Sequence, residues 1–170
     1  VTGALAASMD WRNVAGALPP IGDQGNQFSC VAWSTCYATD FYLKRYLKTG
    51  WNLATFKHQL SPAYLFNLVL QYQAGTDLGA TVSAAEEIHF LKAFDMLTEF
   101  GVTTEFQMPY TVLFDRHPTQ LALDRASALQ QSQECVTNWV SRSDPSVQDW
   151  KRLKRHLIRE GPVLFMIALW

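Results

Sequence analysis

The chain lacks the features that would assign it to several large protein classes. It has 170 residues and only three cysteines, Cys30, Cys36 and Cys135, and an odd number without paired spacing argues against a disulfide framework. No Cys-x-x-Cys pair or histidine cluster has zinc spacing, so neither a metal site nor a cofactor is expected. The absence of paired cysteines favours the cytoplasm or a bacterial secreted or effector protein.

Charge and hydropathy exclude two further classes of partner. The formal net charge is −1, so neither nucleic acid nor an anionic membrane is indicated. No apolar run approaches the length of a bilayer-spanning helix. The basic stretch Lys151–Arg155 alternates with apolar positions and is interpreted as the solvated face of a helix, in preference to a nucleic-acid patch.

What is present suffices for one sizeable core, because 48% of the residues are hydrophobic and 17% charged. Capping residues and helical spacing predict five helices: 29–47 with Ser29 as the cap, 61–72, 83–100, 119–131 and 146–160. Cys36 is expected in the core, and so is Cys135 in a short strand over 135–140. The apolar run over 162–170 predicts a buried terminal strand. Since strands follow the helices, the fold class is predicted to be α+β.

The segment from Asp23 to Ser34 gives the strongest indication of function. Cys30 lies at the first position of a predicted helix, where amide N–H groups and the helix dipole favour an anion and hence the nucleophilic thiolate. Gln24 lies six residues earlier, in a glycine-bearing loop that can fold back over the helix start. Its side-chain N–H and the backbone N–H of Cys30 could hold the oxyanion formed when the thiolate attacks a carbonyl. Trp33, one turn on, would anchor the helix in the core.

This segment resembles the signature of papain-like, cathepsin-type cysteine peptidases, Gln-Gly-x-Cys-Gly-Ser-Cys-Trp-Ala-Phe-Ser. Four further stretches resemble family motifs in the family's order: Asp10-Trp11-Arg12, Leu60-Ser61-Pro62, Phe100-Gly101-Val102 with Pro109-Tyr110, and Leu153-Lys154 with Gly161-Pro162-Val163. The resemblance implies a two-lobe fold, with a complete helical lobe over residues 1–115 and the beginning of a β-barrel lobe over 116–170. It also implies that Cys30 is the nucleophile and Gln24 the oxyanion-hole glutamine.

Several positions depart from the family pattern. Gln27 stands where many members have a disulfide-bonded cysteine, and Phe28 replaces a glycine beside the nucleophile, which would narrow the cleft. The resemblance implies that Phe28 and Ser29 contact the substrate. Gly79 and Ala80 are the nearest candidates for the Gly-Gly pair that lines the groove in the family, and they are expected to contact substrate as well.

The base of the family is a histidine oriented by an asparagine, roughly 130–150 residues after the cysteine. Only 140 residues, 31–170, follow Cys30, and the terminal apolar run resembles the strand that precedes this histidine. The base is therefore expected beyond Trp170, in a further C-terminal segment or a second chain. His156 comes nearest in count but lies within the basic helix. The other histidines belong to the nucleophile lobe or its loops: His58, His89 and His117.

Three functions are compatible with these residues. The first is a peptidase that hydrolyses a peptide or protein substrate and receives its base from the missing segment or second chain. The second is a catalytically inactive binding module that kept the papain-like cleft, which the missing base and Phe28 favour. The third is a toxin- or effector-type protease that acts on one specific protein. None of the three functions requires nucleic acid, a membrane or a cofactor.

Overall fold

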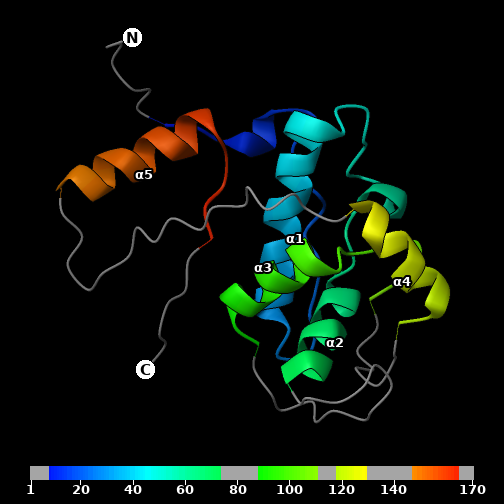
Figure 1. The fold of residues 1–170 in the computed structure, drawn as a ribbon. Coiled ribbons are helices and arrows are strands. Elements are labelled where there is room, and N and C mark those ends of the chain that lie inside the picture. The colour runs from blue at the N-terminus through cyan, green and yellow to red at the C-terminus, as the bar shows by residue number, and fades with distance from the viewer. Residues whose placement is uncertain (1–7, 74–87, 111–117, 130–146, 165–170) are drawn as a thin grey trace.

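The computed structural model describes residues 8–73, 88–110, 118–129 and 147–164, and these are predominantly helical (Figure 1). The elements in chain order are η1 (Trp11–Asn13), α1 (Cys30–Tyr42), η2 (Leu43–Leu47), η3 (Phe56–His58), α2 (Pro62–Gln73), α3 (Phe90–Glu99), α4 (Gln120–Ala126), η4 (Ser127–Leu129) and α5 (Val147–Arg159). The described ranges contain no strand, and their β-pairing is limited to an antiparallel bridge between Leu60 and Thr104. This helical part is compatible with the expected helical lobe, and the β-barrel lobe stays a prediction.

Side-chain caps explain where two helices begin. Ser61 Oγ accepts a hydrogen bond of 3.1 Å from the N–H of Tyr64, and Pro62 occupies the first helical position, where a missing N–H costs nothing. Thr119 Oγ1 accepts a 3.2 Å bond from the N–H of Ala122 at the start of α4. The helices predicted from residues 61 and 119 are therefore confirmed, and α5 confirms the one predicted over 146–160.

The first predicted helix agrees with the structure along its whole length, whereas the third agrees in its C-terminal part but not at Ile88. The first is confirmed, because α1 and the π-helical turn η2 together run from Cys30 to Leu47. The third begins at Phe90, so the prediction that it includes Ile88 is wrong. His89 has an extended backbone (φ −97°, ψ 142°), and Ile88 before it is buried in the core. The helix ends at Glu99, close to the predicted end at residue 100, and Gly101 just beyond the cap residue Phe100 has a left-handed φ of 76°.

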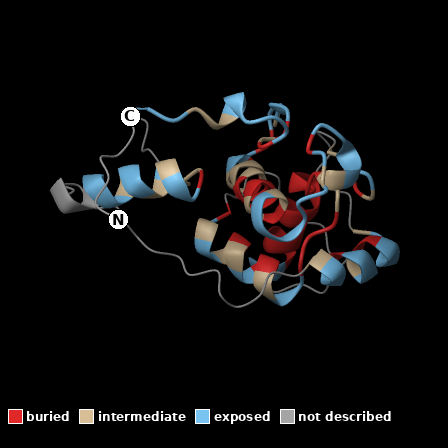
Figure 2. Ribbon diagram, turned by 90° about the horizontal axis from the view of Figure 1, so that it is seen from above, coloured by how far each residue is buried: buried red, intermediate tan, exposed pale blue. Residues whose placement is uncertain are grey.

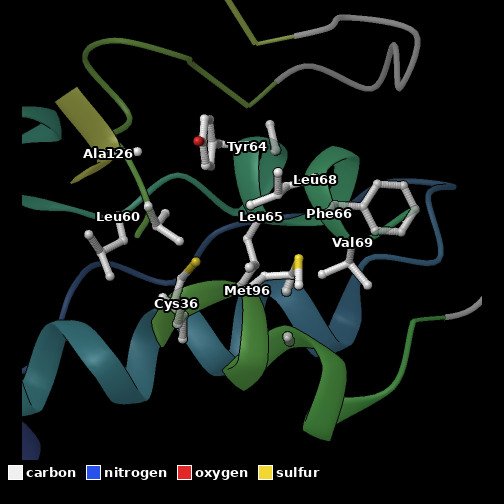
Figure 3. Packing of buried hydrophobic residues seen from close by; sticks show 14 of the residues in the cluster. Cys36, Leu60, Tyr64, Leu65, Phe66, Leu68, Val69, Met96 and Ala126 are labelled. Carbon is white, nitrogen blue, oxygen red and sulfur yellow. The ribbon is translucent and has the colours of Figure 1, made fainter. Parts of the chain in front are cut away.

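The core lies between α1, α2 and α3, with two alanines of α4 added to it. Residues 62–71 of α2 are all buried, so this helix is covered on every side rather than on one face. The helical spacing of the sequence places Leu65, Leu68, Val69 and Tyr72 on one apolar face, and of these only Tyr72 is exposed. Figure 3 shows Leu65, Leu68 and Val69 near Met96 of α3. Each fully buried Leu, Val or Phe contributes about 1.5–3 kcal/mol to folding.

Cys36 confirms its expected place in this core. Its side chain comes from α1 and has no exposed surface, and Figure 3 shows it beneath α2 near Leu60. Burial raises the pKa of its thiol well above the ordinary value, and the carboxyls of Asp40 and Glu105 raise it further. Cys36 is therefore a buried apolar residue, unlike Cys30 at the start of the same helix.

Helix α5 lies at the C-terminal end of α1 (Figure 1). Trp11 Nε1 donates a 2.8 Å hydrogen bond to the carbonyl of Leu157, and an Arg45 guanidinium N–H donates one of 2.9 Å to the carbonyl of Arg159. The basic residues of Lys151–Arg155 are exposed, as expected for a solvated helix face, and Figure 2 shows α5 apart from the buried body. This helix therefore fixes the end of α1 that is remote from Cys30.

Several predictions concern residues outside the described ranges. They are the capping box Ser83–Glu86, the strand over 135–140 with Cys135, the apolar run beyond Leu164 and the lobe boundary near residue 115. Pro162–Leu164 follow α5 and belong to no helix or strand. Within the described residues, no helix combines the length and apolar character needed to cross a membrane.

Candidate functional site

The candidate nucleophile is an exposed thiol at the first position of α1. The first hydrogen bond of this helix runs over 3.0 Å from the N–H of Trp33 to the carbonyl of Ser29. The N–H groups of Cys30, Val31 and Ala32 precede that bond, so no helical carbonyl is available to them. Such N–H groups attract negative charge, which suits either a thiolate or a substrate oxyanion at this helix start.

Ser29 occupies the N-cap position but does not cap the helix, so the predicted role of its side chain is wrong. Its backbone is at φ −99° and ψ 16°, and its side chain accepts no bond from the first-turn N–H groups. The hydroxyl instead lies 2.6 Å from the hydroxyl of Tyr110. The side chain of Ser29 thus leaves the first-turn N–H groups uncapped, and Ser29 itself has no exposed surface.

Gln24 lies at the start of a tight turn just before the helix. The N–H of Gln27 donates to the carbonyl of Gln24 over 3.3 Å, and Gly25 within the turn has a left-handed φ of 58°. Asp23 Oδ1 accepts the N–H of Gly25 at 2.8 Å. The loop therefore turns back as expected. Among the described residues the half-buried Gln24 side chain has no hydrogen-bond partner, which leaves its amide N–H groups available as donors.

The beginning of this loop is fixed against α1 by two aromatic rings. The N–H of Gly22 donates to the hydroxyl of Tyr37 over 2.6 Å, and that hydroxyl donates to the carbonyl of Pro20 over 2.5 Å. A Cβ at Gly22 would lie only 2.2 Å from a ring carbon of Trp33, so glycine alone fits there. Trp33 is half-buried and thus anchors the loop, not the helix in the core as expected.

Tyr110 is the residue of this site to which the sequence assigned no role. Its hydroxyl donates a 2.9 Å hydrogen bond to the carbonyl of Gln24 and contacts Ser29, and its ring centroid lies 4.7 Å from that of Trp33. The only signal was its place in a family-like stretch. Gln24 and Tyr110 are 86 residues apart, so no local pattern could indicate that they meet.

Of the expected substrate contacts that the structure describes, Phe28 is exposed, whereas Ser29 is fully buried and cannot reach a substrate. Phe28 exposes 53% of its surface next to Ser29, where a substrate can reach it. Gln27, which replaces a disulfide cysteine of the resembled family, is 3% exposed, and its Oε1 has no hydrogen-bond partner. Gly79 and Ala80 lie outside the described residues. Contact between Phe28 and a substrate therefore stays a prediction, and the exposure of Phe28 is compatible with it.

Of the described histidines, none is bound to Cys30. His156 Nε2 lies 2.8 Å from the hydroxyl of Tyr42, at the other end of α1. That end is about 18 Å from Cys30 at the helical rise per residue, so His156 is not placed to act as its base. His58 stacks on Trp51 at 5.5 Å, and His89 is exposed at the start of α3; His117 lies outside the described ranges. Where the structure is described, no group of His, Cys, Asp or Glu could hold a metal ion.

Two buried carboxyls support the loop that carries Tyr110. Glu105 Oε2 accepts the N–H of Tyr110 at 2.8 Å, and both oxygens of Asp40 accept the N–H of Leu60, at 3.0 and 3.2 Å. Burial raises the pKa of Glu105 to about 7, and the bond from Tyr110 partly offsets that rise. Burial likewise raises the pKa of Asp40 well above its ordinary value, against the lowering by Leu60. The neutral forms of both acids therefore suit the folded protein.

We expect Glu105→Gln to change how stability depends on pH. The pKa of Glu105 in the folded protein, about 7, lies above its ordinary value of 4.5. Between these two pH values the folded protein keeps the carboxyl proton, whereas the unfolded chain has lost it. Wild-type stability from this group is therefore fully present below pH 4.5 and declines until about pH 7. The glutamine keeps an acceptor for Tyr110 without a charge. Between pH 4.5 and 8, urea unfolding should show the variant gaining about 3 kcal/mol relative to wild type; a pH-independent difference would contradict this.

Comparison with known proteins supports the fold. No protein-family model and no curated protein sequence matches the chain. Among solved structures, the chain is similar to the digestive procathepsin L 3 of the larval midgut of Tenebrio molitor, with a TM-score of 0.53 and 20% sequence identity. The match covers 94% of this chain and 43% of that one, so the chain spans less than half the length of the protein it resembles. The described helical part is thus compatible with the helical lobe of a papain-like fold.

Proposed function

We propose that the chain carries the nucleophile and oxyanion-hole half of a cysteine peptidase active site, with Cys30 as nucleophile and Gln24 as oxyanion donor. The observation that carries the proposal is the exposed thiol at the first position of α1, beside first-turn N–H groups that Ser29 leaves uncapped. The similarity of the fold to that of a procathepsin L supports the same assignment.

In the proposed reaction the thiolate of Cys30 attacks the carbonyl carbon of a peptide bond. A C–S bond forms, and the carbonyl electron pair moves to oxygen, where the amide of Gln24 and the N–H of Cys30 donate to it. Collapse expels the amine, which takes a proton from an imidazolium, and water then hydrolyses the thioester with imidazole as base. No described histidine is bound to Cys30, so the proposed reaction needs a histidine from outside the described residues.

Covalent labelling of the full-length protein with a peptidyl epoxide tests the assignment. The epoxide should alkylate Cys30 alone, because that thiol is exposed, and Cys36 on the same helix is an internal control with no exposed surface. Mass spectrometry of the digested adduct identifies the modified residue. Modification at another residue, or no modification under conditions that inactivate a known thiol peptidase, would refute the proposal.

A binding module that no longer cleaves peptides is the second candidate. It is favoured by the absence of a histidine bound to Cys30 among the described residues and by the exposed Phe28 beside the thiol. Such a module would bind a peptide library without hydrolysing it and would react with the epoxide no faster than a free thiol. Rapid labelling without cleavage of any library peptide would instead favour an effector-type protease with one specific protein target.

A further inference from the structure

The hydroxyl of Tyr110 joins two parts of the candidate site that the chain supplies separately. It lies 2.9 Å from the carbonyl oxygen of Gln24 and 2.6 Å from Ser29 Oγ. A phenol has one proton, and Tyr110 gives it to Gln24, so the hydroxyl of Ser29 must donate to Tyr110. The direction Ser29 to Tyr110 to Gln24 is thereby set. The residue before the nucleophile is thus tied through one oxygen atom to the backbone of the proposed oxyanion donor.

Two contacts hold Tyr110 in this position, and a third bond holds its partner Glu105. Its ring packs against Trp33 with 4.7 Å between centroids, and Trp33 itself lies one turn beyond Cys30 on α1. Its N–H is bound to Glu105 Oε2 at 2.8 Å, and Glu105 is buried. The N–H of Glu105 donates to the carbonyl of Gln59 over 2.8 Å. The position of Tyr110 is therefore set by α1 and by the buried Glu105, and not by the exposed loop that carries Gln24.

The loop is fixed to α1 at Gly22, two residues before Gln24, but the turn itself has fewer bonds to the rest of the protein. Among the described residues, the carbonyl of Gln24 accepts the hydroxyl of Tyr110 and otherwise only the long 3.3 Å bond from Gln27 within the same turn. A side-chain donor stabilises an oxyanion only when its own position is held to about 0.5 Å, and a misplacement of about 1 Å can cost about 10²-fold in rate. The anchoring of the turn thus decides whether the amide of Gln24 can act.

We propose that Tyr110 is a positioning residue for the oxyanion hole: its hydroxyl holds the Gln24 turn against Ser29 at the tip of α1. The inference rests on the proposed peptidase function and extends it to a residue far away in the sequence. Tyr110 touches no reacting atom, so it acts on turnover through Gln24, while the reactivity of the thiol itself does not depend on it.

Tyr110→Phe tests this role, because it removes the hydroxyl and keeps the ring on Trp33. Two reactions of the same thiol are compared in the full-length protein. Hydrolysis of a fluorogenic peptide passes through an oxyanion, whereas alkylation by iodoacetamide forms a C–S bond and expels iodide without one. We expect kcat to fall about 10- to 100-fold, with KM and the alkylation rate within about twofold of wild type. Amide hydrogen exchange at Gly25–Gln27 should become faster.

Tyr64→Phe is the matched control, since the hydroxyl of Tyr64 is buried and has no hydrogen-bond partner in the described structure. It should leave kcat and the exchange of Gly25–Gln27 unchanged. Wild-type kcat and exchange in Tyr110→Phe, or an alkylation rate that falls in parallel with kcat, would overturn the inference alone. A wild-type protein that neither hydrolyses peptide nor reacts with epoxide at Cys30 would overturn the proposed function together with it.

Discussion

Cys30→Ala should abolish peptide hydrolysis, lowering kcat/KM by at least about 10⁴-fold, because no other described thiol is exposed near the start of α1. Alanine is favourable in the first turn of a helix, and removing an exposed thiol creates no cavity, so the variant should fold. The measurement is the initial rate of hydrolysis of a fluorogenic peptide by the purified full-length variant. Its circular dichroism spectrum and unfolding midpoint show whether it is folded.

Cys36→Ala is the control for this result, because it removes the other described thiol from the same helix. Cys36 is fully buried in the core, so this variant should lose stability by a few kcal/mol at most and keep kcat/KM within about twofold. If Cys36→Ala lost activity while Cys30→Ala kept it, the nucleophile would be misassigned. Equal losses in both variants would indicate an effect on folding.

Gln24→Ala should lower kcat by about 10²- to 10³-fold, or about 2.7–4 kcal/mol in the transition state. The side chain of Gln24 has no partner among the described residues, so its removal costs little stability. In the proposed mechanism its amide interacts with the oxyanion, which exists only during acyl transfer. KM and the rate of alkylation of Cys30 by iodoacetamide should therefore stay close to the wild-type values.

The matched control is Gln73→Ala, which removes an exposed glutamine at the end of α2. It should change neither kcat nor the alkylation rate. A Gln24→Ala variant with wild-type kcat would exclude this side chain from the oxyanion hole. One in which alkylation slows as much as hydrolysis would show that Gln24 acts on the thiol, not on the transition state.

Local chemistry made much of the helical part predictable. Two helix starts are marked by Ser61 with Pro62 and by Thr119. The hydroxyls accept a hydrogen bond from an unpaired first-turn N–H group, and proline has no N–H to leave unpaired. Gly101 marks a helix end because only a left-handed residue closes it there. The exposed Cys30 at the first position of α1 follows from the same local logic.

What the sequence could not show depends on partners distant in the chain. Serine is a common helix-capping residue, but the hydroxyl of Ser29 bonds to the hydroxyl of Tyr110 and does not cap the helix. The stripe of α2 suggested one buried face, whereas packing by neighbours on all sides buries Asn67 and Gln71 as well. No sequence pattern singled out Glu105, and its burial with a bond from the N–H of Tyr110 is visible only in the folded chain.

The bond between Tyr110 and Gln24 determines when the loop before Cys30 can become fixed while the chain is being synthesised. The thiol and its glutamine leave the ribosome early, but the residue that ties their loop to the helix follows 86 positions later. A nascent chain that has not reached Tyr110 therefore exposes the thiol without a fixed oxyanion donor. Because long-range contacts close late in folding, acylating competence would arise only once α2, α3 and the loop after them have assembled.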